Sequence, residues 1–209
     1  DRTVRVWDAI NGTLRLILKG HDSGVRSIAL GELLGRSVIV SGSSDHTVRV
    51  WDGGSGVQLS CLKGHKGKVR SVALGKLLGK PLIISGSSDS TVRVWDGSSG
   101  LQLSCLKGHE SRVRSVALGE LSRRPVIISG GSDRTVRVWE WNGISGKQLH
   151  CLEGPKSGVR SVVIGKLSGR SVIISGSSDR TLQIWDGTSG KLLQLLEGHE
   201  SIVSSIVFG

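Results

Sequence analysis

One phrase recurs along this chain of 209 residues: DRTVRVWD, at residues 1–8, returns four times with small changes. The repeats place a tryptophan at intervals of 44, 44, 44 and 46 residues, at Trp7, Trp51, Trp95, Trp139 and Trp185. A fixed period of this length indicates stacked repeat units, because each unit buries its apolar face only against its neighbours. The sequence therefore predicts a single domain over residues 1–209, with units at 1–19 plus 198–209, 20–63, 64–107, 108–153 and 154–197.

Each unit contains four short stretches that favour β-strands. In the unit 64–107 they are 69–74, 81–85, 91–95 and 101–106, and the segment 75–80 (GKLLGK) is interpreted as a glycine-bearing link between the first two. The stretch 81–85 is almost wholly apolar, as in a strand buried on both faces, and the two that follow alternate. Strands at this spacing without helical periodicity predict an all-β fold. A four-stranded antiparallel meander that is repeated radially is a blade of a β-propeller.

The residues of the unit also carry a resemblance to a known family. Gly-His at the start of a unit, followed by Trp-Asp about 30 residues later, resembles the WD40 repeat, and the resemblance covers the whole chain. In that family the strands of a blade are named a to d from the central channel outward. The Gly-His lies in the link from d to a, an Asp in the turn from b to c, and the Trp on strand c. A Ser on strand b completes a hydrogen-bonded structural tetrad.

Three units match this tetrad at identical spacing, with His 30, Ser 10 and Asp 6 residues before the Trp. The fourth has Pro155 in place of the His, so we expect an incomplete network there, because proline has no side-chain donor. A fifth set, divided between the chain ends, lacks the Ser. The tetrad residues are His21, Ser41, Asp45 and Trp51; His65, Ser85, Asp89 and Trp95; His109, Ser129, Asp133 and Trp139; Ser175, Asp179 and Trp185; and His199, Asp1 and Trp7.

The strand count leaves the closure of the ring open. If the ends meet, residues 198–209 add a strand a to the strands c and d of residues 1–19, which gives about five WD40 blades, one lacking strand b. The chain is alternatively a fragment of a larger ring. A third alternative is a homo-oligomer joined through open blade edges, because an unpaired strand edge is a template for pairing.

Ser, His and Asp together also suggest a hydrolase, but catalysis needs an exposed nucleophile with an oriented base. Here the three residues recur together with a tryptophan, which favours a structural role, so we expect no enzyme and no catalytic residue. The segment 75–80 is one residue short of a phosphate-binding loop and ends before Pro81. No Cys/His pair has the spacing of zinc ligands, so neither a metal nor a cofactor is expected.

Three cysteines, Cys61, Cys105 and Cys151, occupy one repeat position. Equivalent positions in successive units lie too far apart for a disulfide, and the count is odd. Reduced thiols predict a cytoplasmic protein. No apolar run approaches the ~20 residues of a membrane span, so a membrane is not an expected partner.

The chain is strongly basic, with 28 Lys and Arg against 17 Asp and Glu, and this favours anionic partners. The resemblance implies a non-catalytic scaffold that binds proteins or peptides on the face around the channel mouth, formed by d–a links and b–c turns. Acidic or phosphorylated peptides suit this face, because an arginine binds carboxylate or phosphate through two N–H groups. Alternatively the arginines pair locally with turn carboxylates. The candidate residues are Arg26, Arg70, Arg114 and Arg160 at the start of strand a, and Lys66, Lys68, Arg112, Lys156, Arg134 and Arg180 on the links and turns.

Two other functions remain open from the sequence. Nucleic acid or another polyanion fits the net charge of +11, but no row of aromatic residues offers a stacking platform. A carbohydrate-binding propeller would need exposed aromatic side chains. The single candidate is Trp141, which stands in the longest c–d turn and is either exposed there as a partner anchor or packed over a neighbouring strand.

Overall fold

The computed structural model describes residues 1–207, so the last two residues of the predicted unit 198–209 lie outside it. The strands form four antiparallel sheets of four strands and one sheet of two, which confirms the predicted all-β, propeller-like fold. No helix in the described part of the chain could span a membrane. In chain order the strands are β1 (Thr3–Trp7), β2 (Leu14–Lys19), β3 (Val25–Leu33), β4 (Arg36–Ser43), β5 (Val48–Asp52), β6 (Gln58–Leu62), β7 (Val69–Leu77), β8 (Lys80–Ser87), β9 (Thr91–Asp96), β10 (Gln102–Lys107), β11 (Val113–Leu121), β12 (Arg124–Gly131), β13 (Thr135–Trp141), β14 (Gly146–Glu153), β15 (Val159–Leu167), β16 (Arg170–Ser177), β17 (Leu182–Asp186) and β18 (Leu192–Leu196).

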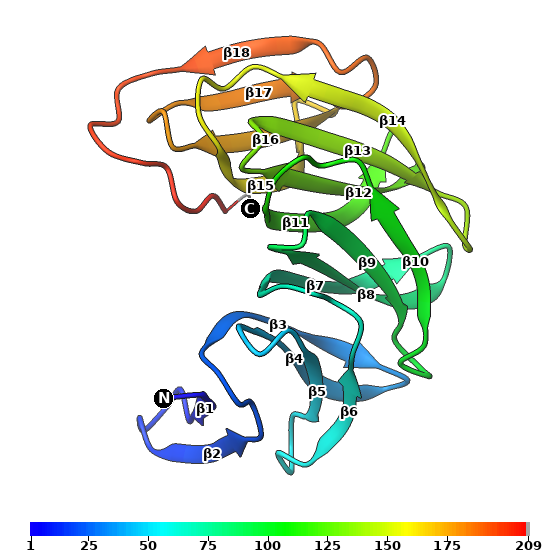
Figure 1. Ribbon diagram of the computed structural model, residues 1–209, viewed down its shortest axis with the longest axis vertical. Helices are drawn as coiled ribbons and strands as arrows, with labels where there is room; N and C mark the ends of the chain where they lie inside the picture. The colour runs from blue at the N-terminus through cyan, green and yellow to red at the C-terminus, as the bar shows by residue number, and fades with distance from the viewer. Residues whose placement is uncertain (208–209) are drawn as a thin grey trace.

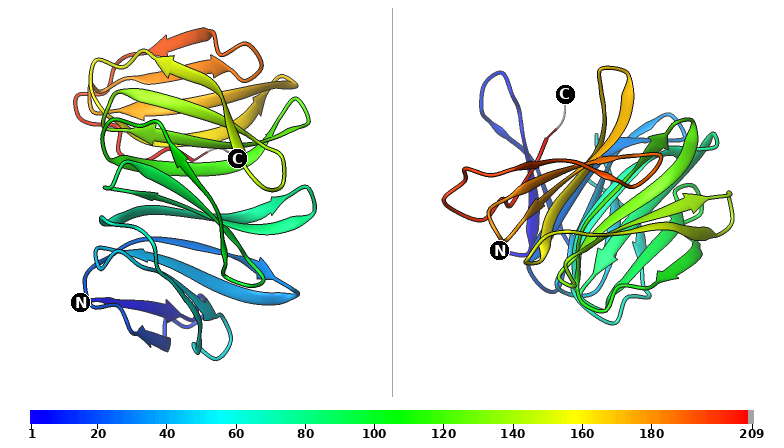
Figure 2. Two further views of the ribbon diagram at one scale, coloured as in Figure 1. Left: turned by 45° about the vertical axis from the view of Figure 1, so that its right-hand side comes forward. Right: turned by 90° about the horizontal axis from the view of Figure 1, so that it is seen from above.

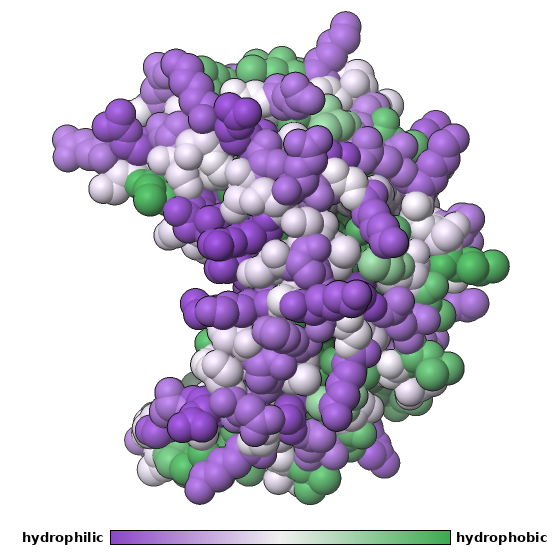
Figure 3. Space-filling model, in the orientation of Figure 1, coloured by the Kyte–Doolittle hydropathy of each residue, from purple (hydrophilic) through white to green (hydrophobic). Residues whose placement is uncertain are grey.

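Each four-stranded sheet is a meander in which consecutive strands are neighbours, so it corresponds to one blade with strands a to d. The blades β3–β6, β7–β10, β11–β14 and β15–β18 follow one another along an arc (Figures 1 and 2). Their first strands, β3, β7, β11 and β15, border an open hollow on the inner side of the arc (Figure 1). The space-filling view shows the same hollow, bordered largely by hydrophilic residues (Figure 3).

The hairpin between strands a and b is longer than the sequence predicts. In β7–β8 the pairing continues to Leu77 and Lys80, so only Leu78 and Gly79 remain unpaired. Both have positive φ, 51° and 73°, which is the conformation of a two-residue turn that matches the twist of the strands. The interpretation of residues 75–80 as a link is therefore wrong for all but these two residues.

The core lies between neighbouring blades rather than inside any one of them. One buried cluster joins Val40 and Val48 of the β3–β6 blade to Val69, Ile83 and Trp95 of the next blade. Equivalent clusters lie at the two following interfaces and beneath β1–β2. Close approach requires glycine on strand b: a Cβ on Gly86 would lie 2.7 Å from a methyl carbon of Val113. Four of the repeated tryptophans, Trp51, Trp95, Trp139 and Trp185, thus fill space between sheets.

The two ends of the described chain do not meet in a shared blade, and the expectation that residues 198–209 complete the unit 1–19 is wrong for this structure. Strands β1 and β2 form a two-stranded sheet against β3–β6 at one end of the arc. Residues near the C-terminus pack at the other end, where Ile206 N donates to Ser161 Oγ at 3.1 Å. The same bond joins Val162 N to Ser115 Oγ one blade earlier. The C-terminal segment therefore occupies the place of a further strand a, and the ring is open.

Candidate docking face around the hollow

The three complete tetrads tie each b–c turn to its d–a link. In the β7–β10 blade, Trp95 Nε1 donates to Ser85 Oγ at 2.8 Å, Ser85 Oγ lies 2.8 Å from His65 Nε2, and His65 Nδ1 lies 2.9 Å from Asp89 Oδ2. The corresponding contacts of the β3–β6 and β11–β14 blades measure 2.7–3.0 Å. Ser85 is fully buried and the His65 side chain is 1% exposed. A hydroxyl in this position holds an indole and does not reach a substrate.

The Asp of each complete tetrad holds the b–c turn against the d–a link. Burial by itself would raise the pKa of Asp45, but hydrogen bonds from the Thr47 hydroxyl and backbone, from His21 and from the Asp22 backbone lower it to about 2. The pKa of Asp133 is lowered to about 2 in the same way, against the effect of burial, with His109 as the leading donor. These carboxylates are ionised at neutral pH, so links and turns are held together by charge-assisted bonds.

The fourth blade keeps only part of this network. Trp185 Nε1 still donates to Ser175 Oγ at 3.0 Å, and the Lys156 backbone N–H donates to Asp179 at 2.7 Å. Pro155 is buried at the histidine position and makes no side-chain hydrogen bond. Beside it, Gln183 replaces the strand-c arginine of the other blades, and its Oε1 is buried without a partner among the described residues.

The predicted fifth tetrad does not form. His199 is exposed at one end of the arc, while Trp7, at the other end, is 54% exposed. Asp1 instead accepts a hydrogen bond from the Thr3 backbone and lies 3.0 Å from Arg5. The physical reason is the open ring: the two halves of this set are on opposite ends of the array.

The arginines at the start of strand a share one arrangement that the sequence did not predict. Each donates a hydrogen bond from Nε to the hydroxyl of the serine just before the tetrad Asp. The pairs are Arg26–Ser44 and Arg70–Ser88 at 2.7 Å, and Arg114–Ser132 and Arg160–Ser178 at 2.6 Å. Ion pairs in the described part of the chain involve none of these arginines. Local pairing with turn carboxylates is therefore not what holds them.

These arginines also lie in one another's electric field. Burial lowers the pKa of Arg70, and the charges of Arg112, Arg26 and Arg160 lower it further. Burial, followed by Arg160, Arg70 and Arg112, lowers the pKa of Arg114. Like charges that reduce one another's basicity mark a region of positive potential, which focuses anions. The strands that carry the row border the hollow (Figures 1 and 3).

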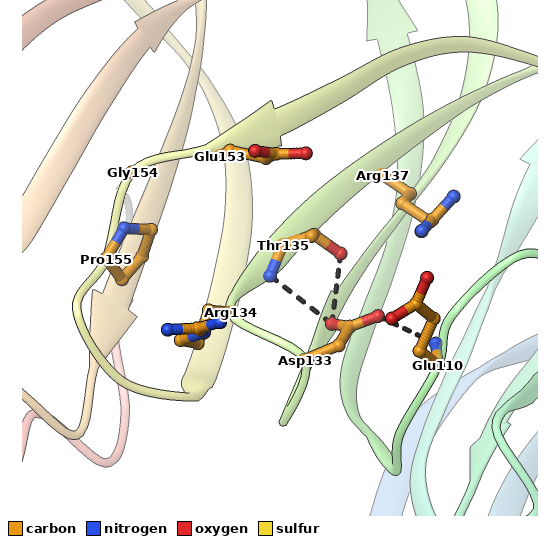
Figure 4. Close-up of a pocket in the computed structure, with 8 residues that line it drawn as sticks. All are labelled: Glu110, Asp133, Arg134, Thr135, Arg137, Glu153, Gly154 and Pro155. Atoms are coloured by element: carbon orange, nitrogen blue, oxygen red, sulfur yellow. Dashed lines mark hydrogen bonds between the residues drawn. The ribbon is translucent and has the colours of Figure 1, made fainter.

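The other candidate residues are not all gathered at the hollow. Lys66, Lys68, Arg112 and Lys156 are exposed on the d–a links. Arg134 instead lines an outer polar pocket of about 380 Å³ with Glu110, Arg137 and Glu153 (Figure 4). The next blade has a similar pocket of about 430 Å³, which Arg180 lines. Arg134 and Arg180 therefore line pockets beside the b–c turns, and the second pocket also contains Ser178, which holds Arg160.

The serines that hold the arginine row were missed at the level of sequence. Ser44, Ser88, Ser132 and Ser178 precede the tetrad Asp in every full unit, as the last serine of SGSSD or SGGSD. By composition alone, such a segment indicates a turn and nothing more. In each of these units the serine follows the row arginine by 18 residues, and this constant spacing is the signal that could have identified the pair.

Trp141 is not an exposed anchor. It is 1% exposed and belongs to the buried cluster between the β7–β10 and β11–β14 blades. The β13 strand extends through Trp141, which turns the indole onto the neighbouring sheet. The carbohydrate-binding alternative loses the one residue on which it rested.

Comparison with known proteins agrees with this architecture. The family model described as "WD domain, G-beta repeat" matches residues 12–52, 56–96, 100–140 and 146–186. A search of curated proteins returned no significant match. The four matches cover most of the chain. Each begins with the last strand of one sheet and continues through the first three strands of the next, so the family repeat is offset by one strand from the structural blade.

Proposed function

Because the chain belongs to the WD40-repeat family, we propose that it is a non-catalytic docking platform for acidic segments of partner proteins. WD40 repeats generally mediate protein–protein interactions, and proteins built from them are usually scaffolds without enzymatic activity. The partner segment docks on the face formed by d–a links and b–c turns, over the mouth of the hollow.

One observation carries this proposal: the row Arg26, Arg70, Arg114 and Arg160. Each guanidinium is held by a serine, and no carboxylate among the described residues lies within ion-pair distance of it. A hydroxyl orients the side chain but does not neutralise its charge. The row therefore retains its attraction for an external anion, and each guanidinium has N–H groups left to bind one.

The chemistry of the face favours an acidic peptide over nucleic acid. Single-stranded nucleic acid is bound by stacking its bases on aromatic side chains in a basic groove. The repeated Trp51, Trp95, Trp139 and Trp185 are buried between sheets and offer no such surface. An extended peptide needs only hydrogen bonds and charges, which the links and turns supply. The free thiols Cys61, Cys105 and Cys151 support a cytoplasmic setting as part of this proposal.

The test measures binding of a fluorescein-labelled oligoglutamate peptide by anisotropy. The triple variant Arg70→Ala, Arg114→Ala and Arg160→Ala should lose most of the affinity. A control with the same change in net charge, Arg15→Ala, Arg36→Ala and Arg124→Ala, alters exposed arginines outside the row and should bind nearly as well as the unaltered protein. Equal loss in both variants would mean that net charge alone attracts the peptide. Tighter binding of a generic oligonucleotide, with a steep salt dependence, would favour the nucleic-acid alternative.

A further inference from the structure

The two middle blades differ from the others at one position beside the arginine row. The position two residues before each row arginine is Gly24, Lys68, Arg112 and Gly158 in the four blades. Only the β7–β10 and β11–β14 blades therefore carry a second cation beside the row. The carbonyls of Lys68 and Arg112 accept the backbone N–H of Ser88 and Ser132, which fixes these links against the b–c turns.

We propose that Arg70, Arg112 and Arg114 form a subsite for a phosphate monoester on the partner peptide, with Lys68 at its edge. This inference rests on the proposed docking function and adds the chemistry of the ligand. A phosphoserine or phosphothreonine occupies the subsite, and the acidic residues around it lie over the flanking Arg26 and Arg160.

The donor groups that these arginines and their serines leave unused support this assignment. Among the described residues, Arg70 and Arg114 each donate only from Nε, to Ser88 and Ser132, so both terminal nitrogens of each guanidinium are available for oxygen ligands. The same two serines act as acceptors and donate no hydrogen bond of their own within residues 1–207. Arg70 and Arg114 stand on neighbouring strands, β7 and β11, which are joined where Val116 N donates to Ser71 Oγ at 3.1 Å. Two guanidinium groups and two serine hydroxyls thus lie on adjacent blades, and phosphate has three oxygens to receive their hydrogen bonds.

Charge distinguishes phosphate from carboxylate at this position. Arg112 is a shared neighbour: it lowers the pKa of both Arg70 and Arg114, after burial as the leading cause. Three guanidinium groups that repel one another are better compensated by a phosphate of charge about −2 than by a single carboxylate of charge −1. Hydrogen bonds between arginine and phosphate are also charge-assisted and bidentate.

The experiment uses one acidic peptide with Ser, phosphoserine or Glu at its central position, titrated against the full chain by anisotropy. The phosphopeptide should bind about tenfold more tightly than the Ser peptide, because it adds charge-assisted bonds, and Glu should recover only part of this gain. Arg112→Ala should remove most of the gain. Arg124→Ala, which changes an exposed arginine at the start of β12, on the a–b hairpin and outside the docking face, should leave the gain intact.

The outcomes separate this inference from the docking function. Binding of all three peptides with equal affinity overturns the phosphate subsite and leaves the docking function standing. If none of the three peptides binds, both the phosphate subsite and the docking function are overturned. Inorganic phosphate is tested as a competitor of the labelled phosphopeptide. If it displaces the peptide at the same concentration as the unlabelled phosphopeptide does, the subsite binds free anions, and the assignment to a peptide is contradicted. Lowering the pH from 7.5 to 5.5 should weaken the binding of the phosphopeptide more than that of the Ser peptide, because the second pKa of the phosphate is about 6 and its charge falls over this range.

Discussion

Arg114 donates a hydrogen bond of 2.6 Å from its guanidinium Nε to the hydroxyl oxygen of Ser132. The two residues lie on different elements, the start of β11 and the turn that follows β12. The bond holds an uncompensated cation in one orientation. Since the same pair recurs in every four-stranded blade, the array presents its arginines in a fixed row.

Removal of this hydroxyl should weaken binding without unfolding the blade. In Ser132→Ala, Arg114 keeps its charge but loses its orientation, so we expect affinity for an acidic peptide to fall about three- to tenfold, the net value of one ordinary hydrogen bond. Anisotropy measures the affinity and circular dichroism the fold. Ser98→Ala, on the exposed β9–β10 turn, is the matched control and should bind normally. An unchanged affinity in Ser132→Ala would show that the arginine needs no anchor.

The strand-b serines should differ in their contribution to stability. Ser85→Ala leaves Trp95 Nε1 and His65 Nε2 buried without partners, whereas Ser175→Ala deprives only Trp185 Nε1. Each unsatisfied buried group costs about 1–3 kcal/mol, so Ser85→Ala should lower the free energy of unfolding by roughly twice as much as Ser175→Ala. Urea denaturation of both variants measures the difference. Equal losses would mean that the histidine contact contributes nothing.

Histidine at position 155 should strengthen the fourth blade. Ser175 and Asp179 stand at the tetrad spacing there, and Pro155 supplies neither a donor nor an acceptor side chain. Pro155→His should raise the free energy of unfolding by about 1 kcal/mol, the net value of a buried hydrogen bond. Pro155→Ala is the control, because it removes the ring without adding an imidazole. Thermal unfolding compares them, and a histidine variant no more stable than the alanine variant would contradict the expectation.

Acid should destabilise the protein in two steps of the same sign. The pKa of Asp45 and of Asp133 is lowered from 3.8 to about 2, and hydrogen bonds lower that of Asp89 as well. A lowered carboxyl pKa stabilises the folded state above the unfolded value. For Asp45 and Asp133 this contribution is about 2 kcal/mol each, and it is lost as pH falls from about 4 toward 2. Burial also lowers the pKa of His21 from 6.5, so protonation in the unfolded state should begin to reduce stability below that pH.

The measurement is the free energy of unfolding in urea from pH 7 to pH 2. Asp45→Asn removes one of the titrating carboxyls, so its stability should fall less steeply between pH 4 and pH 2 than that of the unaltered chain. A curve that is level across this range would show that these carboxylates are not stabilised in the folded state.

Truncation should destabilise the fold far more at Trp141 than at Trp7. Trp141→Ala opens a cavity in the cluster between two blades and should cost about 3–5 kcal/mol of folding free energy. Trp7→Ala removes a side chain that is 54% exposed and should cost much less. Denaturant midpoints give the comparison. A small effect of Trp141→Ala would reopen its interpretation as a partner anchor.

Much of the fold could be predicted from the period of the sequence. A single repeat contains the pattern that predicts the strand positions, the meander and the His–Ser–Asp–Trp spacing, and the other repeats predict the same elements. The incomplete network at Pro155 could also be expected, because it depends on a side chain that proline lacks. Within the unit, the a–b hairpin is longer than the sequence predicts, because Leu78 adopts a positive φ that its residue type does not indicate.

Three properties were decided by tertiary structure. The opening of the ring depends on how far each sheet is rotated against the next, a quantity that accumulates over the array and appears in no single unit. Burial of Trp141 depends on Leu77 and Leu82 of the preceding blade, far away in the sequence. The arginine row depends on the first strands of successive blades lying side by side, which brings Arg70 on β7 next to the strand that carries Arg114, 44 residues later. The residue pattern of one repeat determines the structure of one blade, because the hydrogen bonds of the blade form between residues less than about 44 positions apart. The docking face forms where blades meet, because the charge and burial of its residues depend on the neighbouring blades.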